Sequence, residues 1–193
     1  MSILRISWIR ALFLLALPLL VASCTKENSL ISRRYPCRFH FYFQMHPSSM
    51  LMAAYNSPGT YVFTYSKVEM DRERGASYRY VYVVTNNPDT PEERNRIETQ
   101  IESNVPYMMG ASNEVGLIVG RTNFNGPVAY DRACPTCTGV YPLAWNGRKA
   151  QVVCNNCKRV YDLETGAIVE GAEGEPLMRY MVSVDDVKLT VMN

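Results

Sequence analysis

Two Cys-x-x-Cys pairs constrain this chain more than any other feature of its sequence. Cys134 and Cys137 form the first pair, and Cys154 and Cys157 form the second, with sixteen residues between the pairs. Two residues between cysteines allow a tight turn that directs both sulfurs to one point, and a doubled pair is typical of one metal ion held by four thiolates. Such soft, anionic ligands select zinc or iron over calcium or magnesium. The pattern therefore predicts a four-cysteine metal site.

Disulfides between the same cysteines are the alternative, because the chain begins with a signal for export. Arg5 and Arg10 precede an apolar run of about a dozen residues, which is shorter than the roughly 20 that span a bilayer. Residues 1–23 are therefore predicted to be a signal peptide, with an uncleaved membrane anchor as the alternative.

The end of this segment, Val21-Ala22-Ser23-Cys24, resembles the bacterial lipobox, where a lipoprotein signal peptidase cleaves before a cysteine that becomes acylated. The resemblance implies that Cys24 is the lipidated first residue of the mature protein. The lipid would hold the protein to a membrane without a spanning helix. The expected location is the bacterial cell envelope, on the periplasmic side or exposed at the surface.

Removal of residues 1–23 makes the chain formally neutral. The chain has 20 Lys+Arg and 18 Asp+Glu, and the segment contains two arginines and no acid, so 18 of each remain. No basic excess is left to indicate a nucleic-acid partner. Residues 24–36 are polar and predict a flexible tether, and residues 37–193 have the length of a single domain.

Alternating aromatic and polar residues predict strands. Phe39, Phe41 and Phe43 alternate with polar side chains, as expected of a strand with one buried face. Further strands are expected, separated by turn signals, at 61–65, 78–84, 116–120, 127–130, 151–153, 159–161, 177–184 and 187–192. Many short strands of this kind predict an antiparallel all-β sandwich or small barrel.

One stretch has helical spacing. Thr90-Pro91-Glu92-Glu93 predicts a capping box, and Ile97, Ile101 and Val105 follow at helical intervals until Pro106. We therefore expect one short helix inside an insertion at about 67–112.

Other candidate residues are weaker. Cys37 is expected to be a small buried apolar residue. Met45 and His46 carry soft donors that could bind cuprous copper, but a core or loop role is favoured. The apolar residues between the cysteine pairs would either pack beneath the first pair or form a docking tip; they are Val140, Tyr141, Pro142, Leu143 and Trp145.

Three segments resemble Rieske domains. Val128–Pro135 is similar to the strand that enters the first cluster loop, and Tyr161–Gly166 is similar to the turn after the second loop. Gly171–Leu177, with Tyr180 and Val182 after it, is similar to the closing segment. The match covers about residues 114–192. It implies an antiparallel, Rieske-like all-β domain with a metal-binding subdomain at about 130–175.

The ligands differ from those of a Rieske centre, which binds two irons through two cysteines and two histidines. Cys134 and Cys154 occupy the family's cysteine positions, but Thr136 and Cys157 stand where histidines belong. The set formed with Cys137 resembles the paired turns of rubredoxins and zinc ribbons. We expect one Zn²⁺, with a single iron or a [2Fe-2S] cluster as alternatives.

The expected function is that of a membrane-tethered metal-binding module whose metal is structural. The alternative is a periplasmic electron-transfer protein with a redox partner protein. An enzyme is the weakest reading, because four protein ligands leave no open metal position and no catalytic triad or phosphate-binding loop is visible. No small-molecule substrate and no nucleic-acid partner are indicated.

Overall fold

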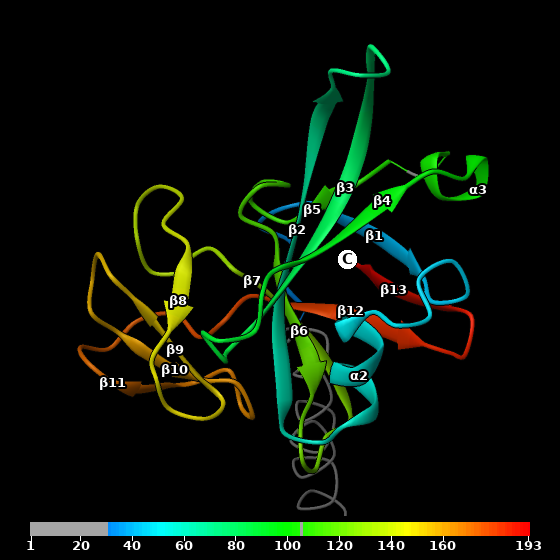
Figure 1. The fold of residues 1–193 in the computed structure, drawn as a ribbon. Coiled ribbons are helices and arrows are strands. Elements are labelled where there is room, and N and C mark those ends of the chain that lie inside the picture. Colours follow the sequence, from blue (N-terminus) through cyan, green and yellow to red (C-terminus); the bar gives the residue numbers. More distant parts are fainter. Residues whose placement is uncertain (1–30, 105) are drawn as a thin grey trace, which may run out of the picture. The chain divides into compact units, whose positions relative to one another are not determined.

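A computed structural model describes residues 31–104 and 106–193 (Figure 1). The predicted signal peptide (1–23), the candidate lipidation residue Cys24 and the first part of the predicted tether lie outside these residues. None of the helices in the described part of the chain has the length and apolar character to cross a membrane.

A large antiparallel sheet contains most of the regular secondary structure among the described residues. This confirms the predicted all-β class. The nine described strands of this sheet curl so that one face encloses a hydrophobic core around Phe39, Phe41 and Val191. In spatial order they are β4 (Glu93–Ile97), β3 (Ala76–Thr85), β2 (Thr60–Asp71), β6 (Leu117–Arg121), β7 (Pro127–Asp131), β12 (Arg179–Val184), β13 (Lys188–Met192), β1 (Cys37–Tyr42) and β5 (Met108–Met109).

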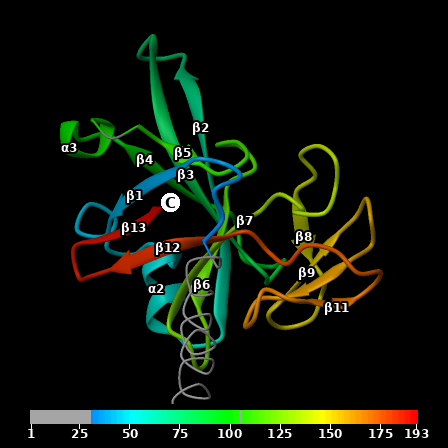
Figure 2. The same ribbon diagram turned by 180° about the vertical axis from the view of Figure 1, so that it is seen from behind.

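A small sheet is formed by the chain between β7 and β12 (yellow to orange in Figures 1 and 2). Its four described strands are antiparallel and lie in the order β11 (Ile168–Glu170), β10 (Val160–Asp162), β9 (Gln151–Cys154) and β8 (Leu143–Trp145). Each has only three or four residues. Strands as short as β8 and β11 have no long hydrophobic pattern, and the sequence did not predict them.

Aromatic contacts join the small sheet to the large one. The ring of Trp145 stacks on that of Phe63 in β2, with centroids 3.9 Å apart and planes inclined by 5°. Leu143 is fully buried in the same cluster. These two residues therefore pack against the large sheet, whereas Val140 and Tyr141 remain 46% and 41% exposed.

The predicted helix is displaced. Residues 93–97 form strand β4, which pairs with β3, so the capping box expected at Thr90 is wrong. A helix of four residues, α3 (Gln100–Ser103), begins only after Thr99, and there a capping box with Glu102 does form. Hydrogen bonding to the neighbouring strand, which local spacing does not reveal, decides the conformation of 93–97.

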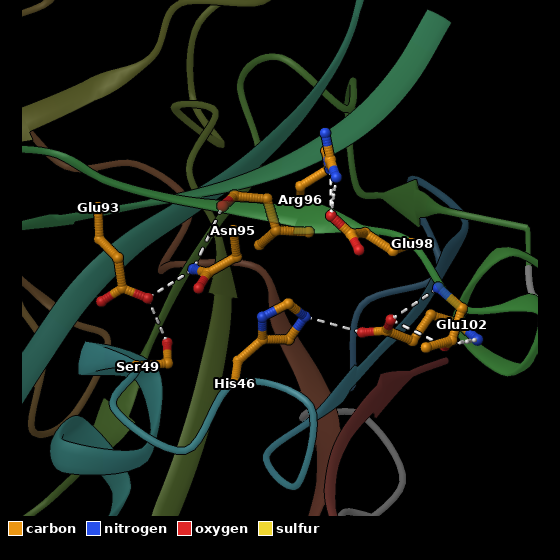
Figure 3. A network of polar contacts seen from close by, with 9 residues as sticks. His46, Ser49, Glu93, Asn95, Arg96, Glu98 and Glu102 are labelled. Atoms are coloured by element: carbon orange, nitrogen blue, oxygen red, sulfur yellow. Dashed lines mark hydrogen bonds and ion pairs between the residues drawn. The ribbon is translucent and has the colours of Figure 1, made fainter. Parts of the chain in front are cut away.

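Glu93 instead bonds to the first turn of a second helix, α2 (Met50–Asn56). The sequence did not predict this helix. The Glu93 carboxylate accepts a hydrogen bond from the Ser49 hydroxyl at 2.5 Å (Figure 3) and another from the Met50 backbone N–H at 2.6 Å. It thereby joins the edge strand β4 to the first turn of α2.

His46 also makes contacts in this part of the molecule, with Glu102 of α3 and with Phe41 of β1. Its Nε2 lies 2.8 Å from a carboxylate oxygen of the buried Glu102 (Figure 3), and its ring stacks on Phe41 with centroids 4.9 Å apart. Met45, for which a core or loop role was favoured, lies in a turn and is 41% exposed, so its role is that of a loop residue. These contacts agree with the structural role favoured for His46.

Candidate metal centre

The first cysteine turn leaves the large sheet at the end of β7. The Cys134 backbone N–H donates to the Tyr141 carbonyl at 2.8 Å, so the turn returns on itself before β8. Gly139 allows this return with φ +105°, a backbone conformation that other residues rarely adopt. The turn is therefore the closed end of an antiparallel excursion that begins beside the large sheet.

Asp131 holds the start of this turn. Its carboxylate is fully buried and accepts hydrogen bonds from the backbone N–H groups of Ala133 at 2.7 Å and Ala111 at 2.8 Å. The Tyr180 hydroxyl donates a third bond at 2.8 Å. Burial raises the pKa of Asp131, while these donors oppose the rise. The carboxylate thus links the first cysteine turn to β12 and to the 110–111 loop.

The second cysteine turn connects β9 to β10. The Lys158 backbone N–H donates to the Cys154 carbonyl at 2.8 Å, and the Cys154 N–H donates to the Arg159 carbonyl at 2.9 Å. Lys158 closes the turn with φ +62°, which is unusual for a residue with a side chain. The turn aims Cys154 and Cys157 at the first pair.

All four predicted ligands meet. The Sγ atoms of Cys134, Cys137, Cys154 and Cys157 lie within 4.8 Å of one another. Across the two turns, Cys134 faces Cys157 at 3.7 Å and Cys137 faces Cys154 at 3.7 Å. A tetrahedral ion with metal–sulfur bonds of about 2.3 Å has sulfur–sulfur edges of about 3.8 Å. The site can therefore hold a metal ion in the way that the spacing predicts.

The cysteines of the described residues are free, and three of the four ligands are buried. Cys157 is the half-buried one. The disulfides considered as an alternative are thus not formed in this structure. Cys37, as expected, is buried among apolar residues of the large sheet, and only 3% of its surface is exposed.

Polar groups surround the sulfurs. The Asn156 side-chain amide donates to the Sγ of Cys137 at 3.3 Å, and the Tyr161 hydroxyl lies 3.5 Å from the Sγ of Cys134. Arg159 follows Cys157 by two residues, and its backbone N–H and guanidinium lower the pKa of the Cys157 thiol. Arg159 is half-buried in the short segment between β9 and β10. Its contacts depend on tertiary structure and leave no signal in the spacing.

These surroundings shift the pKa values of the two cysteines of the second turn in opposite directions. Burial alone would raise the pKa of Cys157, but the backbone N–H and guanidinium of Arg159 and the neighbouring cysteine sulfurs lower it to about 6. Burial raises the pKa of Cys154 to about 12 despite two backbone N–H donors. The half-buried sulfur is therefore the one whose surroundings best stabilise a thiolate.

Both histidines of the chain are engaged elsewhere. His40 bonds to Thr190 of β13, and His46 bonds to Glu102. A group of three or more His, Cys, Asp or Glu side chains could share a metal ion. Within residues 31–104 and 106–193, the four cysteines are the one such group. Comparison with protein-family models, with curated proteins and with solved structures found no match to this chain.

Proposed function

We propose that this chain is a lipid-anchored protein of the bacterial cell envelope that binds one zinc ion through four cysteines, and that the metal is structural. The observation that carries the proposal is the convergence of the four sulfurs, with opposed pairs 3.7 Å apart. Four thiolates fill a tetrahedral zinc ion and leave no position for substrate or water. A closed site of this kind holds two loops together.

The spread of the sulfurs supports a single ion. A [2Fe-2S] cluster places two irons and their bridging sulfides between two thiolate pairs. The two thiolate pairs are therefore farther apart in such a cluster than they are around a single ion. All four sulfurs here lie within 4.8 Å of one another, which is close to the edge of a mononuclear tetrahedron.

The size of the small sheet supports a structural role. Isolated sheets of strands this short are marginally stable, and small subdomains often depend on a metal or disulfides. Cys134 and Cys137 precede β8, whereas Cys154 ends β9, so the metal joins the two ends of the β8–β9 excursion. Loss of the ion should therefore loosen this sheet before the large one.

A mononuclear iron centre for electron transfer is the second candidate. Hydrogen bonds to thiolate ligands adjust the reduction potential of iron–sulfur sites. Asn156, Tyr161 and Arg159 supply such donors, and Val140 and Tyr141 expose apolar surface near the site. These contacts suit an iron site as well as a zinc site.

The Rieske-like assignment is part of the proposal. It is supported by a small sheet that carries the four cysteines in its turns and is inserted between β7 and β12, neighbouring strands of the large sheet. The three sequence segments quoted above also support it. Attachment to the membrane rests on the sequence around Cys24 alone.

Elemental analysis and an absorption spectrum of protein starting at Thr25 test the metal assignment. We expect one zinc per chain and no visible absorption. One iron per chain without inorganic sulfide would indicate the electron carrier, and iron with sulfide would indicate a cluster. Protein that binds no metal when refolded with zinc would refute both candidates.

Fractionation of cells that express the full chain and its Cys24→Ser variant tests the anchor. We expect the wild type in the membrane fraction, carrying a metabolically incorporated acyl label, and an unlabelled variant. Equal behaviour of the two proteins would refute lipidation at Cys24.

A further inference from the structure

The loop formed by residues 171–175, here called the 171–175 loop, lies against both cysteine turns. It has no regular secondary structure, and all five residues are exposed, so no buried side chain of its own fixes it. Loops with so little burial open easily unless polar contacts hold them. Two such contacts are present, one on each cysteine turn.

The first anchor belongs to the turn of Cys134 and Cys137. The Glu175 backbone N–H donates to the Thr136 hydroxyl oxygen at 3.1 Å, and this hydroxyl lies 3.4 Å from the Glu175 carbonyl. The Thr136 hydroxyl is also 3.3 Å from the hydroxyl of Tyr161, which in turn lies 3.5 Å from the Sγ of Cys134. The end of the loop is thus connected to the first cysteine.

The second anchor belongs to the other turn. Arg159 Nε donates to the Ala172 carbonyl at 2.9 Å, and Nη2 donates to the Glu173 carbonyl at 2.8 Å. The backbone carbonyl of Arg159 accepts a hydrogen bond from the Cys154 N–H at 2.9 Å, which fixes Arg159 to the second cysteine turn. The planar guanidinium presents its N–H donors in a rigid fork, so it can hold two successive carbonyls of the loop at once.

Gly174 lies between the two anchors. A Cβ atom added there would be 2.6 Å from the Thr136 hydroxyl oxygen and 2.9 Å from Arg159 Nε. Both distances are below van der Waals contact, so a side chain would push the loop off both anchors. The absence of a side chain is what lets the backbone approach the two turns together.

The contacts form a closed ring. It runs from the Sγ of Cys134 through Tyr161 and Thr136 to the loop, and from the loop through Arg159 to the second cysteine turn, where the Arg159 carbonyl accepts from the Cys154 N–H. Cys134 and Cys157, one from each turn, face each other across 3.7 Å. A metal ion shared by the two turns would fix this distance between Cys134 and Cys157, and it would thereby complete the ring.

We propose that the bound metal positions the 171–175 loop, and that Thr136, Gly174 and Arg159 are the positioning residues that couple the loop to the metal. This inference rests on the proposed four-cysteine metal site. When the metal is absent, the two turns are no longer held at one distance, and a loop anchored on both cannot keep both anchors. The surface beside the centre therefore changes with metal occupancy.

Linkage makes the coupling reciprocal. If the metal orders the loop, the anchored loop must raise the affinity for the metal by the same factor. Residues that contact metal ligands typically change metal affinity by about tenfold to a hundredfold when replaced. We expect an effect of that size from Arg159→Gln, although Arg159 is not a ligand.

Hydrogen exchange measured by mass spectrometry on the full chain tests the proposal. In the zinc-loaded wild type, the peptide that covers 171–177 should be protected at the Glu175 amide, and a chelator should remove that protection. Zinc-loaded Arg159→Gln and Gly174→Ala should exchange in this peptide as the chelated wild type does. Competition with a chromophoric chelator should show the tenfold to hundredfold loss of zinc affinity.

Two variants serve as matched controls. Glu173→Ala alters the same loop but leaves the carbonyl that Arg159 contacts. Arg148→Gln removes an equal charge from the small sheet, where Arg148 pairs with Glu170. Both should retain wild-type protection and affinity. Cobalt in place of zinc reports the ligand set, because its thiolate absorption should persist in Arg159→Gln, which separates a released loop from a collapsed site.

The outcomes separate this inference from the proposed function. Wild-type protein that binds zinc but exchanges equally in 171–177 with and without metal would overturn the coupling and leave the metal site standing. The same holds if Arg159→Gln and Gly174→Ala keep full protection and affinity. A wild type that binds no metal would refute both proposals.

Discussion

Replacing Asp131 by alanine should strongly destabilise the protein. The carboxylate is fully buried and accepts three hydrogen bonds, from the N–H groups of Ala133 and Ala111 and from the hydroxyl of Tyr180. Asp131→Ala leaves all three donors without an acceptor in a site that excludes water. Each unsatisfied buried donor costs about 1–3 kcal/mol.

Because the Tyr180 hydroxyl can rotate toward another acceptor, the two backbone donors set the expected loss, which is about 2–6 kcal/mol in the free energy of unfolding. A loss of that size is a large fraction of the stability of a domain of this length. It should also lower the affinity for zinc, because Ala133 directly precedes the first metal ligand.

Urea unfolding followed by circular dichroism measures the effect, with the slope against urea compared between variants to verify two-state behaviour. Asp162→Ala is the matched control. Asp162 accepts bonds from the backbone N–H and hydroxyl of Thr165 in an exposed turn, where water can replace it. We expect the control to lose about 1 kcal/mol or less. A loss below about 1 kcal/mol for Asp131→Ala would refute the argument from buried donors.

Three further predictions follow from other contacts. Trp145→Ala removes the stack on Phe63 and should cost about 2 kcal/mol of unfolding free energy in urea, with the small sheet loosened first in hydrogen exchange; unchanged stability would contradict the packing role. Gly110→Ala should cost about 2–4 kcal/mol in the same assay, because a Cβ there would lie 2.1 Å from an Asp131 carboxylate oxygen and φ is +68°; a stable variant would show that the loop can move aside. Burial, and then the neighbouring cations of β13 and β1, lower the pKa of His40 below 6.5, so its contribution is present above pH 6.5 and lost as the pH falls through the folded-state pKa. His40→Gln should therefore lose less stability than the wild type between pH 7 and pH 5, and parallel pH profiles from thermal unfolding would refute this.

The error at residues 90–105 shows where local pattern fails. Thr90, Glu93, Ile97 and Ile101 have the spacing of a capped helix, yet 93–97 pair with β3. The same five residues also alternate, with Ile97 buried and Arg94 and Arg96 lying over the rings of Tyr80 and Tyr78. Both periods fit so short a stretch, and pairing with the preceding strand β3 decides between them.

The polar surroundings of the centre could not be predicted from the sequence. Arg159 follows the last ligand closely and resembles an ordinary surface residue until the 171–175 loop is placed beside it. Tyr161 was part of a motif, but only the fold brings its hydroxyl to Cys134. Long polar side chains choose their partners after the backbone is placed, and no fixed spacing in the chain reports that choice.

Local sequence patterns were enough to predict the all-β class and the four cysteines that could share a metal ion. Strand alternation and the two-residue spacing of Cys134–Cys137 and Cys154–Cys157 are local rules, because pleating and tight turns involve only neighbouring residues. The tertiary structure alone decided that the two turns meet at 3.7 Å and that the 171–175 loop lies on both. Those facts depend on how β8, β9 and β10 pair and on the path that the chain takes back to β12, neither of which is set by the immediate neighbours of each cysteine.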